Sequence, residues 1–336
     1  MKKSCIISII ITCFMVISFF GCGDKGASEK SGLKKIIVAE IKSEFWLPVY
    51  LAKPLGFFKE EGLDIEFVAY KDGPIAFQGM HAGNSQFCLL STEPVLRAYD
   101  QGKESKIILS ALKSKPYMFV GRKGIKNIKD LKGKIVFAGM PGSAPYSFAQ
   151  SLLMKAGLNP DKDVTWANME YGASLGALEK GTIDGLYLRP TAKNDVKKIE
   201  AVILADMSDP AQHKKVYGSD KYEATIVTVT KDYAEKNPEI IQNFVNAVVK
   251  AIIWQAKNSD ELVAKTAAPF FEGIKMDAEF INNLRPFFSL NGDISKEGHD
   301  TIMKFCLETK IVSKPIPYEK IIDTSYVKKA YKEFSK

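Results

Sequence analysis

Short apolar runs rich in β-branched residues alternate with segments of helical spacing along most of the chain. The first set of predicted strands covers residues 35–39, 63–70, 87–90 and 106–112. The segments between these runs have prolines near their starts and glycines near their ends, which is the usual asymmetry of helix termini. Strands that alternate with helices predict a mostly parallel sheet with helices on its faces.

A second set of apolar runs repeats this arrangement. Its predicted strands cover residues 134–138, 164–168, 183–188 and 201–204, and its predicted helices cover 144–156 and 173–180. After one more strand at 224–230 the spacing becomes helical, over residues 238–257, 259–271, 277–290, 295–309 and 325–334. The pattern therefore predicts an α/β protein with two lobes, each a mostly parallel sheet flanked by helices, and a helical C-terminal tail that packs on the first lobe.

The length of 336 residues suits two lobes of ordinary size. We expect lobe 1 to be discontinuous, with residues 33–118 plus 225–336, and lobe 2 to comprise residues 119–224. Two crossovers between the lobes, near residues 115–122 and 222–230, would then act as a hinge.

The N-terminal segment resembles an export signal. Two lysines precede an apolar run over residues 5–20, which has the length of a secretory signal rather than of a membrane span. The run ends in Phe-Phe-Gly-Cys at 19–22, which resembles a bacterial lipobox except for its two bulky phenylalanines. We expect a signal peptide at 1–21, a lipid on Cys22 and a flexible tether at 22–32, with an uncleaved anchor helix as the alternative. The protein would then be exported and anchored to the outer face of the cell membrane.

Charge and composition exclude several classes of function. The formal net charge is +8, but lysines are scattered among acids instead of forming a basic, aromatic-rich face, so no nucleic-acid partner is expected. Cys88 and Cys306 stand alone in apolar surroundings and are predicted to be buried free thiols. The histidines, His81, His213 and His299, form no catalytic triad or zinc signature. We expect no catalytic residues, no metal and no cofactor, and a monomeric chain.

Five segments resemble, in the same order, the substrate-binding proteins of ABC transporters of the nitrate, sulfonate, taurine and thiamine-pyrimidine type. They are LPVYLAKPLGFFKEEGL (47–63), GMHAGNSQFCLL (79–90), IKDLKGKIVFAGMPG (128–142), ASLGALEKGTIDGL (173–186) and TKDYAEKNPEIIQNF (230–244). The resemblance implies the two-lobed periplasmic-binding fold of class II, capture of a small molecule by hinge closure, and delivery to an ABC permease with its ATPase. Pro54 departs from the family, which commonly has an acidic or polar residue there, and proline predicts a short or kinked first helix.

Two alternatives to transport remain open. The same fold is shared by fungal pyrimidine-forming enzymes of thiamine synthesis and by some dehydratases of the menaquinone pathway. Those enzymes lack a bacterial lipoprotein leader, and the cysteine-rich iron motif of the fungal enzymes has no counterpart here, so an enzyme is the weaker hypothesis. A tethered sensor subunit that presents its ligand to a membrane receptor is the other alternative.

Ligands of such folds lie outside the carboxyl ends of parallel strands, so the loops after the predicted strands are the candidate site. The residues proposed to bind the ligand are Trp46, Asp72, Ser91, Thr92, Glu93, Tyr117, Gly142, Ser143, Ala144, Tyr146, Tyr171 and Arg189. The aromatic members of this set, together with Tyr187, favour an organic, ring-containing ligand over a bare inorganic anion.

Two of these features predict a negatively charged ligand. Gly142-Ser143-Ala144 would place free N–H groups of a helix N-terminus at the cleft, unless Ser143 only caps its helix. Arg189 could offer its guanidinium to an anion, or could pair with Glu93 across the cleft. In the second case the pair would latch the lobes, and Glu93 could alternatively receive an amine.

Overall fold

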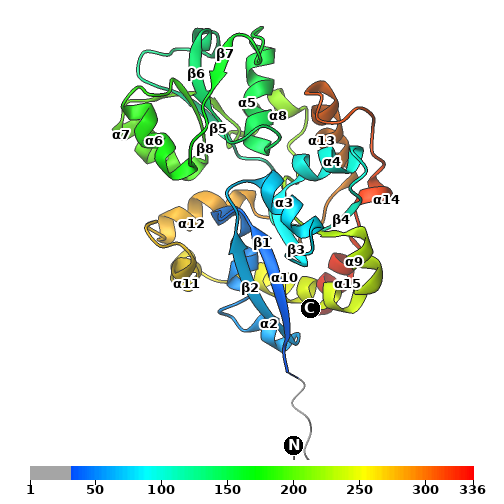
Figure 1. Ribbon diagram of the computed structural model, residues 1–336. Coiled ribbons are helices and arrows are strands. Elements are labelled where there is room, and N and C mark those ends of the chain that lie inside the picture. The colour runs from blue at the N-terminus through cyan, green and yellow to red at the C-terminus, as the bar shows by residue number, and fades with distance from the viewer. Residues whose placement is uncertain (1–31) are drawn as a thin grey trace, which may run out of the picture. The chain divides into compact units, whose positions relative to one another are not determined.

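The computed structural model describes residues 32–336 (Figure 1). The predicted signal peptide at 1–21, the lipidation site Cys22 and all but the last residue of the tether at 22–32 lie outside the described residues. Within the described part of the chain, no helix is both long and apolar enough to cross a membrane.

The first sheet has five strands in the order β2-β1-β3-β10-β4. Its strands are β1 (Lys34–Glu40), β2 (Leu63–Ala69), β3 (Phe87–Ser91), β4 (Ser105–Ser110) and β10 (Thr225–Thr230). β1 pairs in parallel with β2 and β3, whereas β10 is antiparallel to both of its neighbours. Four strands therefore run in one direction, and only the strand that returns from the distant part of the sequence runs against them.

The second sheet has the order β7-β6-β8-β5-β9 and repeats this plan. Its strands are β5 (Met118–Gly121), β6 (Lys134–Phe137), β7 (Val164–Trp166), β8 (Gly185–Leu188) and β9 (Val202–Asp206). β6 is parallel to β7 and β8, and β5 is antiparallel to β8 and β9. The predicted fold class, an α/β protein with two largely parallel sheets, is confirmed.

Helices flank the sheets and form the C-terminal tail. The helices among the strands are α1 (Leu47–Leu51), α2 (Phe57–Glu60), α3 (Gly73–His81), α4 (Thr92–Asp100), α5 (Ala144–Lys155), α6 (Tyr171–Glu179), α7 (Lys193–Lys198) and α8 (Pro210–Tyr217). The tail comprises α9 (Lys231–Lys236), α10 (Pro238–Lys257), α11 (Asp260–Ala267), α12 (Ala278–Leu284), α13 (Lys296–Glu308), α14 (Tyr318–Ile321) and α15 (Ser325–Phe334). α10 has the predicted bounds, and α1 ends before Pro54, as the missing N–H of that proline led us to expect.

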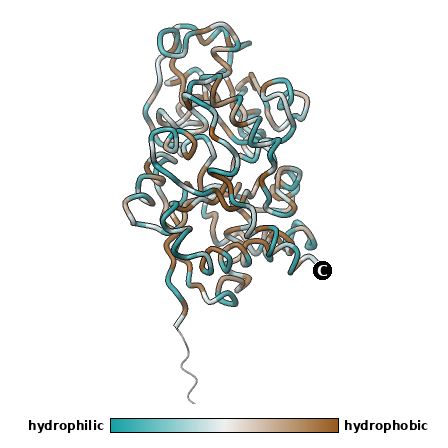
Figure 2. Tube along the Cα trace, turned by 90° about the vertical axis from the view of Figure 1, so that its right-hand side faces the viewer, coloured by the Kyte–Doolittle hydropathy of each residue, from teal (hydrophilic) through white to brown (hydrophobic). Residues whose placement is uncertain are grey.

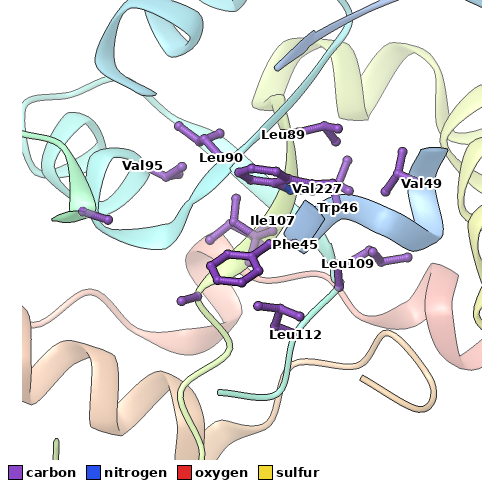
Figure 3. Close-up of a cluster of buried hydrophobic side chains, with 14 of the residues drawn as sticks. Phe45, Trp46, Val49, Leu89, Leu90, Val95, Ile107, Leu109, Leu112 and Val227 are labelled. Atoms are coloured by element: carbon purple, nitrogen blue, oxygen red, sulfur yellow. The ribbon is translucent and has the colours of Figure 1, made fainter. Parts of the chain in front are cut away.

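The hydrophobic residues concentrate on the inner elements of the fold (Figure 2). In the first sheet, residues of β3, β4 and β10 pack against the turn that follows β1, and Phe45 and Trp46 of that turn lie inside the cluster (Figure 3). Phe45 is 3% exposed and Trp46 is 5% exposed. This packing fixes the loop after β1, which contributes to the candidate site described below.

Two short crossovers, residues 111–117 and 218–224, connect the sheets. The sequence interpretation had extended the first crossover to residue 122, but Met118–Gly121 form β5. All four residues of β5 are buried, so the strand has no alternation of apolar and polar positions by which it could be recognised. The crossovers are bonded to each other, since the Tyr222 N–H donates to the Lys113 carbonyl at 3.1 Å.

A buried ion pair holds both crossovers to α4. The Lys115 ammonium donates to a carboxylate oxygen of Glu93, and neither side chain has any exposed surface. The Tyr222 hydroxyl donates to the same oxygen at 2.8 Å. The ring centroids of Tyr117, Tyr222 and Phe305 each lie 4.9 Å from the ammonium. The carboxylate and the aromatic faces together replace the hydration that the ammonium loses on burial.

Removal of one partner tests this role of the ion pair. The variant Lys115→Met would leave the Glu93 carboxylate buried without a counter-charge, and we expect the free energy of unfolding in urea to fall by about 3–5 kcal/mol. The double variant Lys115→Met/Glu93→Gln, which removes both charges and keeps an acceptor for Tyr222, should recover most of this loss. A single variant as stable as the native chain would contradict this role.

Candidate functional site

A cavity of about 250 Å³ lies where the loops of the two sheets meet. We call it the inner chamber. Its walls come from the loops that follow β1, β2 and β3 in the first sheet and β6, β7 and β8 in the second, together with Tyr117 and Thr225 beside the crossovers. Loops at the carboxyl ends of parallel strands from both sheets therefore converge on one space, as expected for a binding site in an α/β fold.

The structure brings most of the candidate residues together at this chamber. Those that line it are Trp46, Asp72, Ser91, Tyr117, Ser143, Ala144, Tyr171 and Arg189. Trp46 also carries a buried indole N–H that has no hydrogen-bond acceptor among the described residues. A buried donor of this kind is costly unless it finds a partner.

Four candidates are not among the lining residues. Thr92 donates from its hydroxyl to the Glu223 carbonyl at 2.9 Å, and Glu93 is paired with Lys115. Gly142 lines a separate cavity of about 450 Å³ with Arg97, and the Tyr146 ring packs on Trp166 with a centroid distance of 4.2 Å. Ser91 occupies the N-cap position of α4 without a side-chain cap hydrogen bond, and its hydroxyl lies 3.2 Å from the Tyr117 hydroxyl at the chamber. Ser91 therefore faces the chamber, whereas the next two side chains turn into the protein.

Arg189 forms its ion pair with Glu44, which corrects the alternative that paired it with Glu93. Glu44 begins the short helix η1 (Glu44–Trp46) after β1, and Arg189 follows β8 just before η3 (Pro190–Ala192). The Arg189 guanidinium donates to one Glu44 oxygen, and the Thr191 hydroxyl donates to the other at 2.8 Å. Burial alone would lower the pKa of Arg189, but the adjacent carboxylate raises it above its ordinary value. Arg189 therefore stays charged.

Asp72 makes a second polar contact between the loops of the two sheets. Its Oδ1 accepts from the Gly73 N–H at 2.7 Å and so caps α3. Its Oδ2 accepts from the Met140 N–H at 2.9 Å and from the Tyr171 hydroxyl at 3.3 Å, and both donors belong to loops of the second sheet. Burial raises the pKa of Asp72, and these hydrogen bonds oppose that shift. Asp72 thus joins the two sides of the chamber.

Tyr117 forms the wall between the chamber and the crossovers. Its ring meets the Tyr187 ring edge-on at 4.7 Å, and its hydroxyl lies 3.2 Å from the Ser91 hydroxyl. The Lys115 ammonium contacts the same ring. Burial raises the pKa of both tyrosines, so their hydroxyls remain neutral hydrogen-bonding groups at neutral pH.

Ser143 caps its helix, as the simpler interpretation of the sequence held. Its Oγ accepts from the Tyr146 N–H at 3.3 Å. Ser143 and Ala144 nevertheless line the chamber, so contact with a ligand stays a prediction.

Gly139 is a residue of the site that sequence reasoning missed. It has a φ of 80°, and a Cβ built there would overlap the Tyr171 hydroxyl oxygen and lie 2.8 Å from Ser143 Oγ. Two of its neighbours, Asp72 and Tyr171, come from distant parts of the chain, so the sequence around this glycine does not reveal the crowding.

The described residues hold no group of three His, Cys, Asp or Glu side chains that could bind a metal ion. His213 Nδ1 lies 2.8 Å from the Ser219 carbonyl, and His299 Nε2 lies 2.8 Å from the Ile316 carbonyl. Burial lowers the pKa of both imidazoles. These two histidines therefore bond to backbone carbonyls rather than to the chamber.

Comparisons with known proteins agree on family and fold. Residues 45–262 match the family model described as "NMT1/THI5 like". A putative aliphatic sulfonates-binding protein of Bacillus subtilis is 26% identical, over 100% of this chain and 98% of the relative. A solved structure from Bordetella bronchiseptica has a TM-score of 0.80 with 22% identity, covering 90% of this chain and 98% of the other. A desulfurization enzyme, at 14% identity over 89% and 99% of the two chains, has a TM-score of 0.62, so the fold also occurs in enzymes.

A methyl group added at Gly139 tests the contact between Asp72, Ser143 and Tyr171. We expect Gly139→Ala to lower the free energy of unfolding by about 1–3 kcal/mol, because an L-residue is strained at this φ and the Cβ displaces Tyr171. Gly172→Ala is the matched control, since its Cβ meets nothing within 4 Å and alanine favours the helix by up to about 1 kcal/mol. Chemical denaturation of both variants measures the difference, and equal stabilities would contradict the arrangement.

Proposed function

The chain belongs to the NMT1/THI5-like family of ABC-transporter substrate-binding proteins, and on that premise we propose that its inner chamber captures a small organic anion of the sulfonate type for import. The observation that carries this proposal is the convergence of loops from both sheets on one chamber. A solute in that chamber touches both sides, so its full binding energy is realised only when the sides are closed around it.

Closure takes place about the two crossovers. The body built on the first sheet and the body built on the second sheet, which begins at Met118, move relative to each other about residues 111–117 and 218–224. Glu44 contacts Arg189, and Asp72 contacts Tyr171, across the two sides of the chamber, and in this mechanism opening separates both pairs. The solute and these contacts therefore favour the same state.

The chamber's chemistry supports a charged head attached to an apolar or ring-shaped part. The Arg189 guanidinium and the N-terminus of α5 at Ser143 and Ala144 suit a sulfonate or carboxylate. Tyr117, Tyr171 and Tyr187 supply aromatic surface, and the unpartnered Trp46 N–H offers a donor. The chamber is smaller than the roughly 300–1,000 Å³ of pockets for drug-sized ligands, which favours a small solute.

Delivery to a membrane complex completes the proposal. The signal peptide at 1–21 directs export and is then removed. The lipid on Cys22 and the tether at 22–32 hold the monomer at the outer face of the membrane, where its closed form meets an ABC permease with its ATPase. The presence of permease and ATPase genes beside the gene of this protein would distinguish transport from the function of a tethered sensor. A pyrimidine-forming or dehydratase-type enzyme on the same fold is the second alternative, but no arrangement of catalytic groups in the chamber favours it.

Calorimetry and thermal shift test the proposed ligand class. We expect an alkanesulfonate to raise the melting temperature more than nitrate, pyrimidines, aromatic acids or flavins do. Arg189→Met should weaken binding roughly 10- to 100-fold, because a hydrogen bond to a charged group contributes about 1.5–3 kcal/mol. Arg122→Met is the control, since Arg122 pairs with Asp184 and does not line the chamber. Stabilisation by a neutral pyrimidine or flavin alone would contradict the ligand class.

A further inference from the structure

The Glu44 carboxylate rests on a ready-made set of anion donors. It accepts from the Arg189 guanidinium, from the Thr191 hydroxyl at 2.8 Å and from the Ser43 hydroxyl at 3.5 Å. Only 2% of its side-chain surface is exposed. A guanidinium and a hydroxyl that converge in this way are the donors that recognise a sulfonate or carboxylate. An anion subsite therefore exists, and a carboxylate of the chain itself fills it.

The Glu44–Arg189 pair stands at the boundary between two cavities. Arg189 lines the inner chamber and also a second cavity of about 440 Å³, which we call the outer chamber. Glu44 lines the outer chamber, where residues of α7 and α12 such as Asn194, Lys198 and Asn283 form the opposite side. The outer chamber also holds Asp195, Asp277 and Glu279, with Lys198 paired to Asp195 and Lys275 paired to Asp277. A carboxylate that leaves Arg189 would therefore enter polar surroundings that contain both signs of charge.

The charges of the inner chamber leave little for an anionic solute unless Glu44 moves. Its lining cations are Lys42, Lys71 and Arg189. Lys71 pairs with Glu170 at 2.9 Å and Arg189 pairs with Glu44, so the exposed Lys42 is the one lining cation without an ion pair among the described residues. A solute anion that reached Arg189 while Glu44 stayed in place would bring two like charges together in a largely dry site, which disfavours both.

We propose that Glu44 is a built-in competitor for the anion subsite made by Arg189 and Thr191, and that the anionic head of the solute displaces it toward the outer chamber. The proposal rests on the proposed function, because it assumes an anionic organic solute. Glu44 then determines specificity, since a neutral analogue has no charge with which to replace a carboxylate on a guanidinium. It also lowers affinity for the true solute, because each binding event must first break an existing ion pair.

The direction in which one substitution changes the affinity for the solute distinguishes a competitor from a residue that contacts the solute. Glu44→Gln removes the competing charge and keeps the size of the side chain. With ethanesulfonate as the probe, isothermal titration calorimetry should show binding at least about tenfold tighter than to the native chain. The matched control is Glu279→Gln, which removes an exposed carboxylate of the outer chamber that forms no ion pair with Arg189 or with the other cations of the inner chamber. That variant should bind ethanesulfonate within about twofold of the native chain.

The remaining outcomes are decisive as well. Weaker or unchanged binding to Glu44→Gln would overturn the competitor role, and weaker binding of taurine in particular would indicate that Glu44 contacts an amine. Binding to none of the three proteins would overturn the proposed sulfonate class, and the displacement with it.

If Glu44→Gln does not fold, Glu44→Asp replaces it. In this variant the shorter carboxylate lies farther from Arg189, so the variant should bind ethanesulfonate more tightly than the native chain does. Equal binding would count against the proposal.

Discussion

The ion pair between Lys115 and Glu93 holds together the region on which both sheets depend. Lys115 lies in the first crossover, Tyr222 in the second, and Glu93 in α4 of the first sheet, so one buried carboxylate joins three segments. The second crossover is also held by Glu223, whose carboxylate accepts from the Ser295 N–H at the start of α13. An ammonium and a carboxylate removed from water must remain paired. We expect this requirement to keep both crossovers bonded to α4 while the two sheets move.

The effect of this ion pair extends to the inner chamber through Tyr117. One part of its ring contacts the Lys115 ammonium, and its hydroxyl lies beside Ser91 on the chamber wall. At the far side of the chamber, Glu44 and Asp72 of the first sheet's loops bond to groups of the second sheet's loops. The chamber is thus bounded by a permanent buried pair at the crossovers and by polar contacts that can be exchanged. In the proposed mechanism, a solute that takes over one of the exchangeable contacts shifts the balance between open and closed states.

The sequence predicted the helices and the loops of the site better than it predicted which side chains contact one another. α10 was found with its bounds because an N-cap, a first-turn proline and a helical apolar spacing coincide there. The loops at the carboxyl ends of the strands were found because parallel sheets bring these ends together. The pairing of Glu44 with Arg189 was missed because the two residues are 145 positions apart, and no local pattern encodes such a pairing. Glu93 was wrongly predicted to line the chamber. The direction of a helical side chain depends on where the helix begins, and the sequence alone does not fix the first residue of α4.

We propose that a solute closes the two sides of the chamber about the crossovers. Spin labels at Lys59→Cys on α2 and Lys180→Cys after α6 would occupy exposed positions on the two sides, while the native Cys88 and Cys306 are buried. Electron–electron resonance should give a shorter label-to-label distance, or a distribution shifted toward its short component, when ethanesulfonate is added at a concentration that calorimetry shows to be saturating. An unchanged distribution with the solute bound would contradict the claim.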